Sequence, residues 1–510
     1  MRIVRETGQR VTLSGVRDAY FNGEFEACIA LAEEFRARSA EDATEVTFLR
    51  ARSLLALNRQ DQALETVRNL RLSDRPLDEY LTAQLLLGAA YVALGQIKPG
   101  LDILARAQVA AADAHPTVQA ELRVFHAQAL YRLKRLDEAQ RLLDEVPSTA
   151  DIIYARALEY SGWIALAREE FPVAVERFRA ALRCIDRCRR YDRFVESKAL
   201  YGLAFLCGEL PRLDLWPEIR ERALRFDWTV SGVAVWRYWF ALEASFATEM
   251  RGELAASVQW ATLAEDVSPS ESCRIIAWCR LAARLGRYGE SGAHAYFLTR
   301  ARAAYDRLAR DGRLLDEPSL SLTLAEEFVH GGNPEDAAAL LTYYAQTVVP
   351  GRLGNPDEAR LETTRLLVQG QLEESRGERA HAEANYKQAL ARFQGHGFHR
   401  RAAIVAYRLA ALTGDERYFD LVSSTLHDAD DAYWVKQNIA RSRLAMRLSD
   451  RQTTVLRLVS EGKTNKEIAS VCGVSFFTAR NTVRELLRIL DARTRGDLSA
   501  IAVARGVAFR

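Results

Sequence analysis

Five polar side chains near the C-terminus share a spacing that would place them on one face of a helix. They are Thr478, Arg480, Asn481, Arg484 and Arg488. Arginine and asparagine suit paired hydrogen bonds with base edges in the DNA major groove, and hydroxyls contact phosphates. Because basic residues on a helix are often only solvated, the pattern indicates DNA binding only if the surrounding elements would present this face.

Helix start and stop signals predict those elements. Three pairs have capping-box spacing, in which two side chains satisfy the free amides at a helix start: Ser449 with Gln452, Thr464 with Glu467, and Thr494 with Asp497. Glycines at the expected helix ends are Gly462, Gly473 and Gly506. A helix over 465–472, a turn at 473–474 and a helix over 475–490 predict a helix-turn-helix, whose second helix enters the major groove. Caps, turn and basic face coincide, which favours DNA as the ligand.

Several short motifs of the last 63 residues stand in a recognisable order. They are Leu448-Ser449, Arg451, Val455-Leu456, Glu461-Gly462, NKEIA at 465–469, GVS at 473–475 and Thr478. Together they resemble the signature of the LuxR (GerE-type) DNA-binding domain of bacterial transcription regulators. The resemblance covers about one-eighth of the chain and implies a four-helix domain over 448–510.

The resemblance also implies partners and roles. Base contacts would fall on Arg480, Asn481 and Arg484, and backbone contacts on Thr464, Lys466 and Thr478 of the same segment. The full expected set for double-stranded DNA is Thr464, Asn465, Lys466, Thr478, Arg480, Asn481, Arg484 and Arg488. A homodimer packed through the last helix, about Arg495 to Arg505, is implied as well.

The segment departs from the family pattern at several positions. Gln452 and Thr454 replace acidic residues, Ala479 replaces a valine, and Thr482 stands where histidine is frequent. Phe476-Phe477 replaces a polar pair at the start of the second helix. These phenylalanines would either contact thymine methyl groups or pack on a neighbouring domain, and the sequence leaves both open.

The charge of the chain is unevenly distributed. Residues 436–510 hold 15 Lys and Arg against 6 Asp and Glu. The chain totals of 70 and 68 then leave 55 basic and 62 acidic residues before them. A basic tail on an acidic body predicts that a polyanion binds the tail alone.

Most of the chain before this tail reads as repeated helical pairs. Small residues recur at spacings of 35, 37, 39 and 35 residues, namely Cys28, Ala63, Gly100, Ala139 and Ala174. A period just above 34 with a small residue where helices cross resembles the tetratricopeptide repeat. The predicted fold is all-α: a TPR-like α-solenoid over 1–413, a linker over 414–447 with a basic end, and the LuxR-type domain over 448–510. Such arrays bind partners on a concave surface, here a peptide, protein or small-molecule effector.

Aromatic residues gather in the middle of this array. Six of the eight tryptophans lie between Trp216 and Trp278. The candidate effector or partner surface is Trp228, Trp236, Arg237, Trp239 and Trp260. The same cluster is also what a large hydrophobic core would need, so both interpretations stay open.

No residue pattern predicts catalysis, a cofactor or a metal. Gly462-Lys463-Thr464 resembles the end of a phosphate-binding loop, but Arg457 stands where its first glycine is needed. The seven cysteines include no CxxC pair, and no secretory or membrane-spanning apolar run is found, so we expect a cytoplasmic protein without a membrane partner.

Two hypotheses follow. The first is a transcription regulator, not an enzyme, whose array senses an effector and controls the tail. The alternative is a protein-interaction scaffold whose tail no longer reads DNA.

Overall fold

The computed structural model describes residues 11–70, 75–188, 192–210, 213–229, 233–287, 291–314, 318–347, 355–425, 448–490 and 492–504. Within these ranges every regular element is helical. The all-α prediction is therefore confirmed. None of the described helices combines the length and apolar character needed to span a bilayer.

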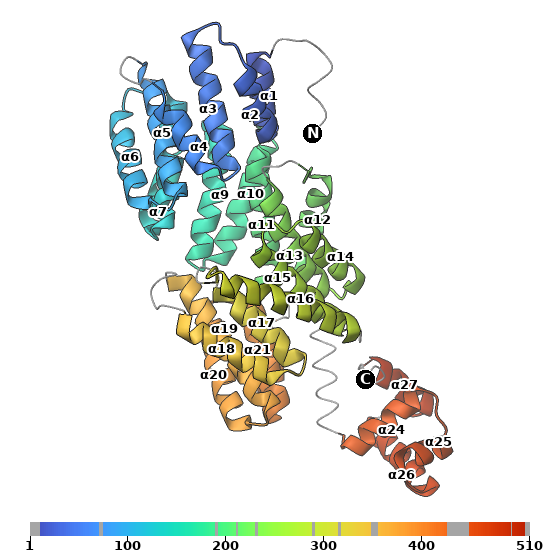
Figure 1. The fold of residues 1–510 in the computed structure, drawn as a ribbon. Helices are drawn as coiled ribbons and strands as arrows, with labels where there is room; N and C mark the ends of the chain where they lie inside the picture. The colour runs from blue at the N-terminus through green and yellow to red at the C-terminus, as the bar shows by residue number, and fades with distance from the viewer. Residues whose placement is uncertain are drawn as a thin grey trace.

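The helices before residue 426 follow one another as packed hairpins (Figure 1). The pairs are α1 (Leu13–Phe21) and α2 (Phe25–Glu34), α3 (Ala40–Ala56) and α4 (Gln60–Arg68), α5 (Leu77–Ala93) and α6 (Ile97–Ala110), α7 (Pro116–Arg132) and α8 (Leu136–Asp144), α9 (Ile152–Ala167) and α10 (Phe171–Ile185), α11 (Arg193–Glu209) and α12 (Trp216–Arg225), α13 (Ala234–Met250) and α14 (Leu254–Asp266), α15 (Glu271–Arg287) and α16 (Ser291–Arg310), α17 (Pro318–His330) and α18 (Pro334–Thr347), α19 (Asn355–Ser375) and α20 (Arg379–Gly395), and α21 (His399–Thr413) and α22 (Glu416–Thr425). Short 3-10 helices lie at Ser148–Ala150 and Leu213–Leu215.

The last of these helices changes a predicted boundary. We expected a linker from residue 414, but α22 lies within it and packs on α21. Phe419 and Val422 are completely buried there, and this apolar burial stabilises a final helix. The array therefore continues to Thr425, and the rest of the predicted linker, 426–447, lies outside the described residues.

Small residues stand where paired helices cross, as the repeat spacing predicts. Cys28, Ala63, Ala139 and Ala174 are buried at these positions. In the α5–α6 pair, a Cβ atom added to Gly100 would lie 2.6 Å from Val92 Cγ2 and 2.7 Å from the Gly88 carbonyl oxygen. Since a Cβ atom has no room there, only glycine allows this close approach.

Replacement of Gly100 by alanine should therefore destabilise the array despite the better helix propensity of alanine. We expect the free energy of unfolding to fall by about 1–3 kcal/mol, the typical cost of overpacking, measured by urea unfolding. Gly208→Ala in α11 is a matched control, because its added Cβ would meet nothing within 4 Å and a helical alanine is favoured. Equal stability of the two variants would contradict the crossing constraint.

The array closes on itself, since α21 contacts α11 from almost two hundred residues away. One hydrophobic core includes residues of both regions. Phe171 meets Phe398 with ring centroids 5.6 Å apart, and His396 Nδ1 lies 2.8 Å from Glu169 Oε1. In Figure 1 the α19–α21 region accordingly lies beneath α9 to α11.

A buried ion pair joins the two regions. Glu209 is 2% exposed and accepts hydrogen bonds from Arg400 at 2.7 Å and Arg401 at 3.4 Å. Burial alone would raise the pKa of Glu209, but the two guanidinium groups outweigh it and lower that pKa to about 2. The contact therefore contributes stability only while this carboxylate is charged.

The ion pair of Glu209 predicts that the free energy of unfolding falls in acid. Because the pKa falls from 4.5 unfolded to about 2 folded, the contribution is complete above pH 4.5 and is lost as the pH falls to 2. The shift corresponds to about 3 kcal/mol. We expect the loss of unfolding free energy between pH 5 and pH 3 to be smaller in Glu209→Gln than in the wild type. The same loss in both proteins would contradict this account.

Candidate nucleic-acid interface and inner cavity

The C-terminal residues form four helices: α24 (Asp450–Ser460), α25 (Asn465–Cys472), α26 (Phe476–Ile489) and α27 (Arg495–Ala504). They pack around one core of their own, which contains Leu448, Val455, Leu456, Ile468, Val483, Leu486 and Leu498. The orange-red helices of Figure 1 show this small bundle.

The predicted capping boxes are confirmed. Ser449 and Gln452 exchange hydrogen bonds at the start of α24, with distances of 2.7 and 3.3 Å. Thr464 and Glu467 do the same at the start of α25. This helix ends at Gly473, whose φ of 62° is in the left-handed region, as a glycine stop requires. Gly506 lies outside the described residues. These local interactions fix the angle at which α26 leaves the turn.

A buried stripe sets the orientation of α26. Its inward residues are Ala479, Thr482, Val483 and Leu486. Two departures from the family pattern, Ala479 and Thr482, are thus core positions, and Thr482 Oγ1 donates to the Thr478 carbonyl at 3.0 Å. They therefore leave the outer face of the helix unchanged.

The outer face of α26 carries the predicted DNA-contacting residues. Arg480, Asn481, Arg484 and Arg488 are all exposed. Within the part of the chain that the structure describes, no carboxylate forms an ion pair with these three arginines. Thr478 is half-buried, and its hydroxyl lies 2.8 Å from Ser475 Oγ at the helix start. The face thus presents three uncompensated guanidinium groups to solvent.

The remaining predicted residues lie at the start of α25. Thr464 and Lys466 are exposed. Asn465 is half-buried, and its Oδ1 accepts a hydrogen bond from Arg495 Nη1 at 2.8 Å. Arg495 also donates to the Lys463 carbonyl. Asn465 therefore ties α25 to α27 in this structure.

The predicted aromatic surface divides into two groups. Trp228 and Trp260 pack on Phe240, with centroid distances of 5.2 and 5.8 Å, and belong to the core. Trp236 and Trp239 line a cavity. Arg237 is half-buried and lies outside the lining of that cavity. Part of the cluster thus packs with the core, and another part faces a cavity.

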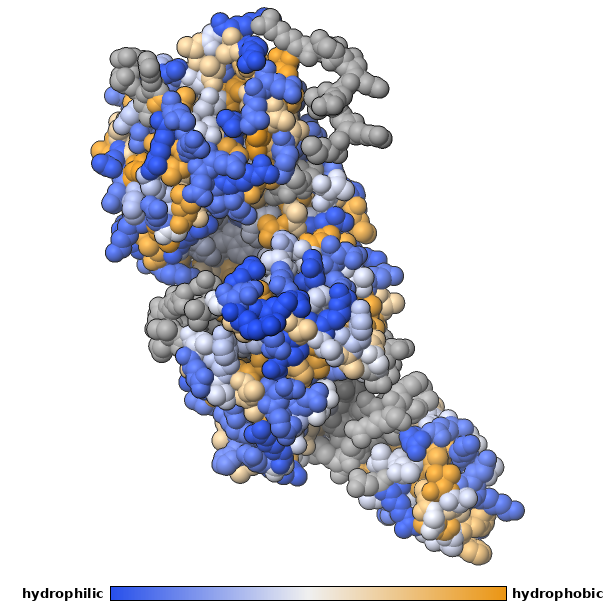
Figure 2. Space-filling model, in the orientation of Figure 1, coloured by the Kyte–Doolittle hydropathy of each residue, from blue (hydrophilic) through white to orange (hydrophobic). Residues whose placement is uncertain are grey.

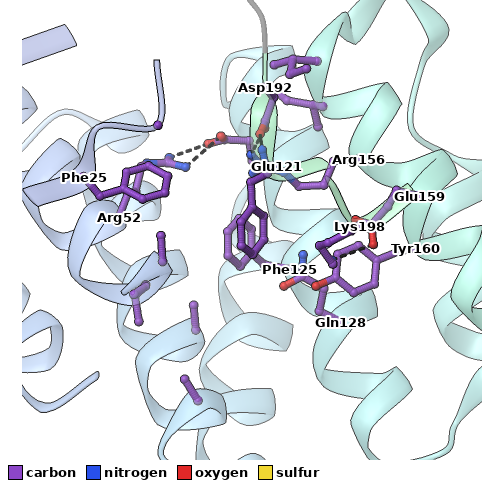
Figure 3. Close-up of a pocket in the computed structure, with 18 of the residues that line it drawn as sticks. Phe25, Arg52, Glu121, Phe125, Gln128, Arg156, Glu159, Tyr160, Asp192 and Lys198 are labelled. Carbon is purple, nitrogen blue, oxygen red and sulfur yellow. Dashed lines mark hydrogen bonds and ion pairs between the residues drawn. The ribbon is translucent and has the colours of Figure 1, made fainter. Parts of the chain in front are cut away.

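The cavity has a volume of about 880 Å³ and lies on the inner side of the array. Its walls come mostly from α1 and from the first helix of each pair from α3 to α13, with Phe25 of α2 and Gln60 of α4 at the margin. This volume lies within the range of small-molecule sites. Residues that the sequence analysis did not single out dominate the lining in Figure 3: Arg52, Glu121, Phe125, Gln128, Arg156, Glu159, Tyr160, Asp192 and Lys198.

Ion pairs cross the cavity from helix to helix. Arg52 on α3 pairs with Glu121 on α7 at 2.7 Å, and Arg156 on α9 pairs with Asp192 at 2.8 Å. Burial would raise the pKa of Glu121, but Arg52 outweighs this effect and the pKa lies below its usual value. The charges of these four side chains therefore neutralise each other in pairs.

A third pair is fully buried. Lys198 Nζ lies 2.6 Å from Glu159 Oε1 and 4.1 Å from the centre of the Tyr160 ring. The two side chains are 6% and 0% exposed, and Trp163 Nε1 also donates to Glu159. Such a pair is favourable only while both members remain.

Aromatic rings form a continuous wall beside this pair. Tyr201 lies at its centre, 5.5 Å from Trp163, 5.8 Å from Trp236 and 6.3 Å from Trp239, measured between ring centroids. All four side chains are half-buried and line the cavity. The wall therefore offers apolar surface and π faces to a ligand.

Residues 446–502 match the family described as "Bacterial regulatory proteins, luxR family". A curated relative, the transcriptional activator protein TraR of Rhizobium radiobacter, is 33% identical over 81 residues, which make up 16% of this chain and 29% of that protein. The chain therefore spans less than a third of the relative's length.

Solved structures resemble the chain at low identity. A Rap protein complexed with competence and sporulation factor has 12% identity and a TM-score of 0.42, covering 74% of this chain and 99% of that one. The apo form of the quorum sensor NprR from B. thuringiensis has 13% identity and a TM-score of 0.40, covering 81% and 97%. The helices before residue 426 form an array of helical pairs, and residues 446–502 match the luxR family of bacterial regulatory proteins.

Proposed function

We propose that this protein is a sequence-specific, DNA-binding transcriptional regulator whose helical array binds an effector and controls the C-terminal domain. The observation that carries the proposal is the exposed, unpaired arginine face of α26 within a luxR-family domain. Such a face suits a polyanion, and its helix-turn-helix frame matches the shape of the major groove.

The residues have distinct roles in this proposal. Arg480, Asn481 and Arg484 contact base edges, because they follow one another along the outer face of the second helix. Thr464, Lys466, Thr478 and Arg488 contact the backbone, where they set orientation rather than sequence preference. Asn465 supports the surface by holding Arg495.

A homodimer would double this interface. The last helix buries Leu498 and Ala502 against the domain core, while Ala500 is exposed on its other side. We propose that two copies meet along the exposed side of α27 that carries Ala500, as the family resemblance implies. Arg505, at the expected end of this helix, lies outside the described residues.

The inner cavity is the proposed input site. Three ion pairs neutralise six of its charged side chains, which favours a ligand of little net charge beside them. The aromatic wall around Tyr201 favours an apolar or aromatic group. We therefore propose an amphipathic effector that contacts several first helices at once and changes the curvature of the array. Trp236 and Trp239 would report its binding by fluorescence.

The proposal is tested by selecting DNA from a random duplex library with the full-length chain at several salt concentrations. We expect a dyad-symmetric motif and an affinity that falls steeply as salt rises, because counterions are released at each phosphate contact. Binding without sequence preference, or no binding, would contradict the proposal. That outcome would favour the alternative of an interaction scaffold, for which the exposed phenylalanines of α26 would be the docking surface.

A further inference from the structure

Two large aromatic side chains stand in solvent at the start of α26. Phe477 is 70% exposed and Phe476 40% exposed, and their rings meet edge to face at 6.0 Å. Both belong to the first turn, directly after the N-cap Ser475. This aromatic pair beside the arginine face offers apolar surface whose removal from water on binding would be favourable.

The register of the helix places Phe477 on the outer face of α26 that carries the predicted DNA-contacting residues, called the stripe below. Positions three, four, seven and eleven residues later are Arg480, Asn481, Arg484 and Arg488, and all are exposed. Residues at these intervals share one face of a helix. Helical side chains lean toward the N-terminus of the helix, so the Phe477 ring lies at the N-terminal end of the stripe.

Phe476 faces a different direction. The positions three and seven residues later are Ala479 and Val483, which are buried in the domain core. Phe476 therefore lies at the boundary between the core and the stripe, and its edge-to-face contact supports the Phe477 ring. This difference makes Phe477 the base-facing member of the pair.

We propose that Phe477 determines specificity by contacting the C5-methyl group of a thymine in the major groove. This inference rests on the proposed function and names a further base contact of the same surface. The N-terminal residues of a recognition helix reach base edges, and thymine is the only base that presents a methyl group there, which suits an apolar side chain. The flanking guanidinium groups bring this ring to DNA by binding acceptor atoms and phosphates on either side.

The test compares thymidine with deoxyuridine, which lacks only this methyl group. A preferred duplex is first selected with the full-length protein, and each thymine of the motif is then replaced in turn. At one thymine of each half-site we expect wild-type affinity to fall about fourfold, the change that corresponds to about 0.8 kcal/mol for one buried methyl group.

Substitutions assign the effect to the residue. Phe477→Ala should bind the thymidine and deoxyuridine duplexes equally, whereas Arg484→Ala should bind both less tightly but keep the fourfold difference. Val471→Ala is a matched control, because Val471 is 60% exposed on α25 and lies outside the stripe.

Two results would overturn the inference. The first is a wild-type protein that binds every deoxyuridine duplex as tightly as the parent motif. The second is a Phe477→Ala variant that keeps the methyl dependence or the wild-type affinity, which would assign Phe477 to a protein partner. Failure to enrich any motif would instead contradict the proposed function itself, and this inference with it.

Discussion

Replacement of Arg484 by alanine is expected to lower affinity for the selected DNA motif by about 1–3 kcal/mol, or roughly fivefold to 150-fold. The side chain is exposed midway along the α26 stripe and has no carboxylate partner among the described residues. A paired contact with a base would therefore be lost without compensation from the protein. Affinity for random DNA should change little, since other basic residues supply the phosphate contacts. Fluorescence anisotropy with both duplexes measures the difference.

Lys466→Ala provides the contrasting control for Arg484→Ala. Lys466 is exposed at the start of α25 and is proposed to contact a phosphate. Its loss should weaken binding to every sequence alike and reduce the slope of log affinity against log salt by about one. Arg480→Ala should behave like Arg484→Ala. If Arg484→Ala lost equal affinity for specific and random DNA, its assignment to base recognition would be wrong.

The largest effect on stability is expected for Lys198→Met, which should lower the free energy of unfolding by about 3–5 kcal/mol. The methionine keeps the apolar stem but removes the ammonium that pairs with Glu159. Glu159 is completely buried, so its carboxylate would lose its direct partner in the cavity wall. Urea unfolding followed by tryptophan fluorescence suits this measurement, because Trp163 and Trp236 lie beside the pair.

A double variant separates loss of the pair from loss of packing. Lys198→Met combined with Glu159→Gln removes both charges and should recover most of the lost stability, since no buried charge then remains. If the double variant were as unstable as Lys198→Met alone, packing of the lysine stem would account for the effect. Lys387→Met is a surface control, as Lys387 pairs with Glu383 in an exposed position and should contribute little.

Local chemistry made the C-terminal domain predictable from sequence. The partners in each capping box are three residues apart, so Thr464 and Glu467 can be identified without knowing the fold. The glycine that ends α25 needs a left-handed conformation, which the residue type itself suggests. The repeats were also predictable, because the small residue where two helices cross recurs at the period of one helical pair.

Interactions distant in sequence were not predictable in this way. The hydrogen bond that the Asn465 side-chain oxygen accepts from Arg495 joins residues thirty positions apart in the sequence. The contact of His396 with Glu169 depends on how far the whole array curves. Neither residue type nor local spacing carries that information, because curvature accumulates from small rotations between many pairs.

The residues that line the cavity were predictable only in part. Phe125, Tyr160, Lys198 and Trp236 all line it and follow one another at intervals of 35, 38 and 38 residues. These intervals match the period of the array, so a search for side chains one repeat apart would have found this row. The four lining residues differ in chemical type, so their regular spacing is not evident from the sequence. The small residues at the helix crossings are alike, and their period can be seen directly.

The contact of α21 with α11 has a consequence for how this gene can evolve. Repeat proteins usually gain or lose whole repeats by duplication and deletion, because each repeat meets only its neighbours. Here Glu209 must meet Arg400, and Phe171 must meet Phe398, across the intervening pairs. Adding or removing one helical pair between α12 and α20 would move these partners too far apart to make contact. Copy number should thus be invariant within that interval among descendants of this gene.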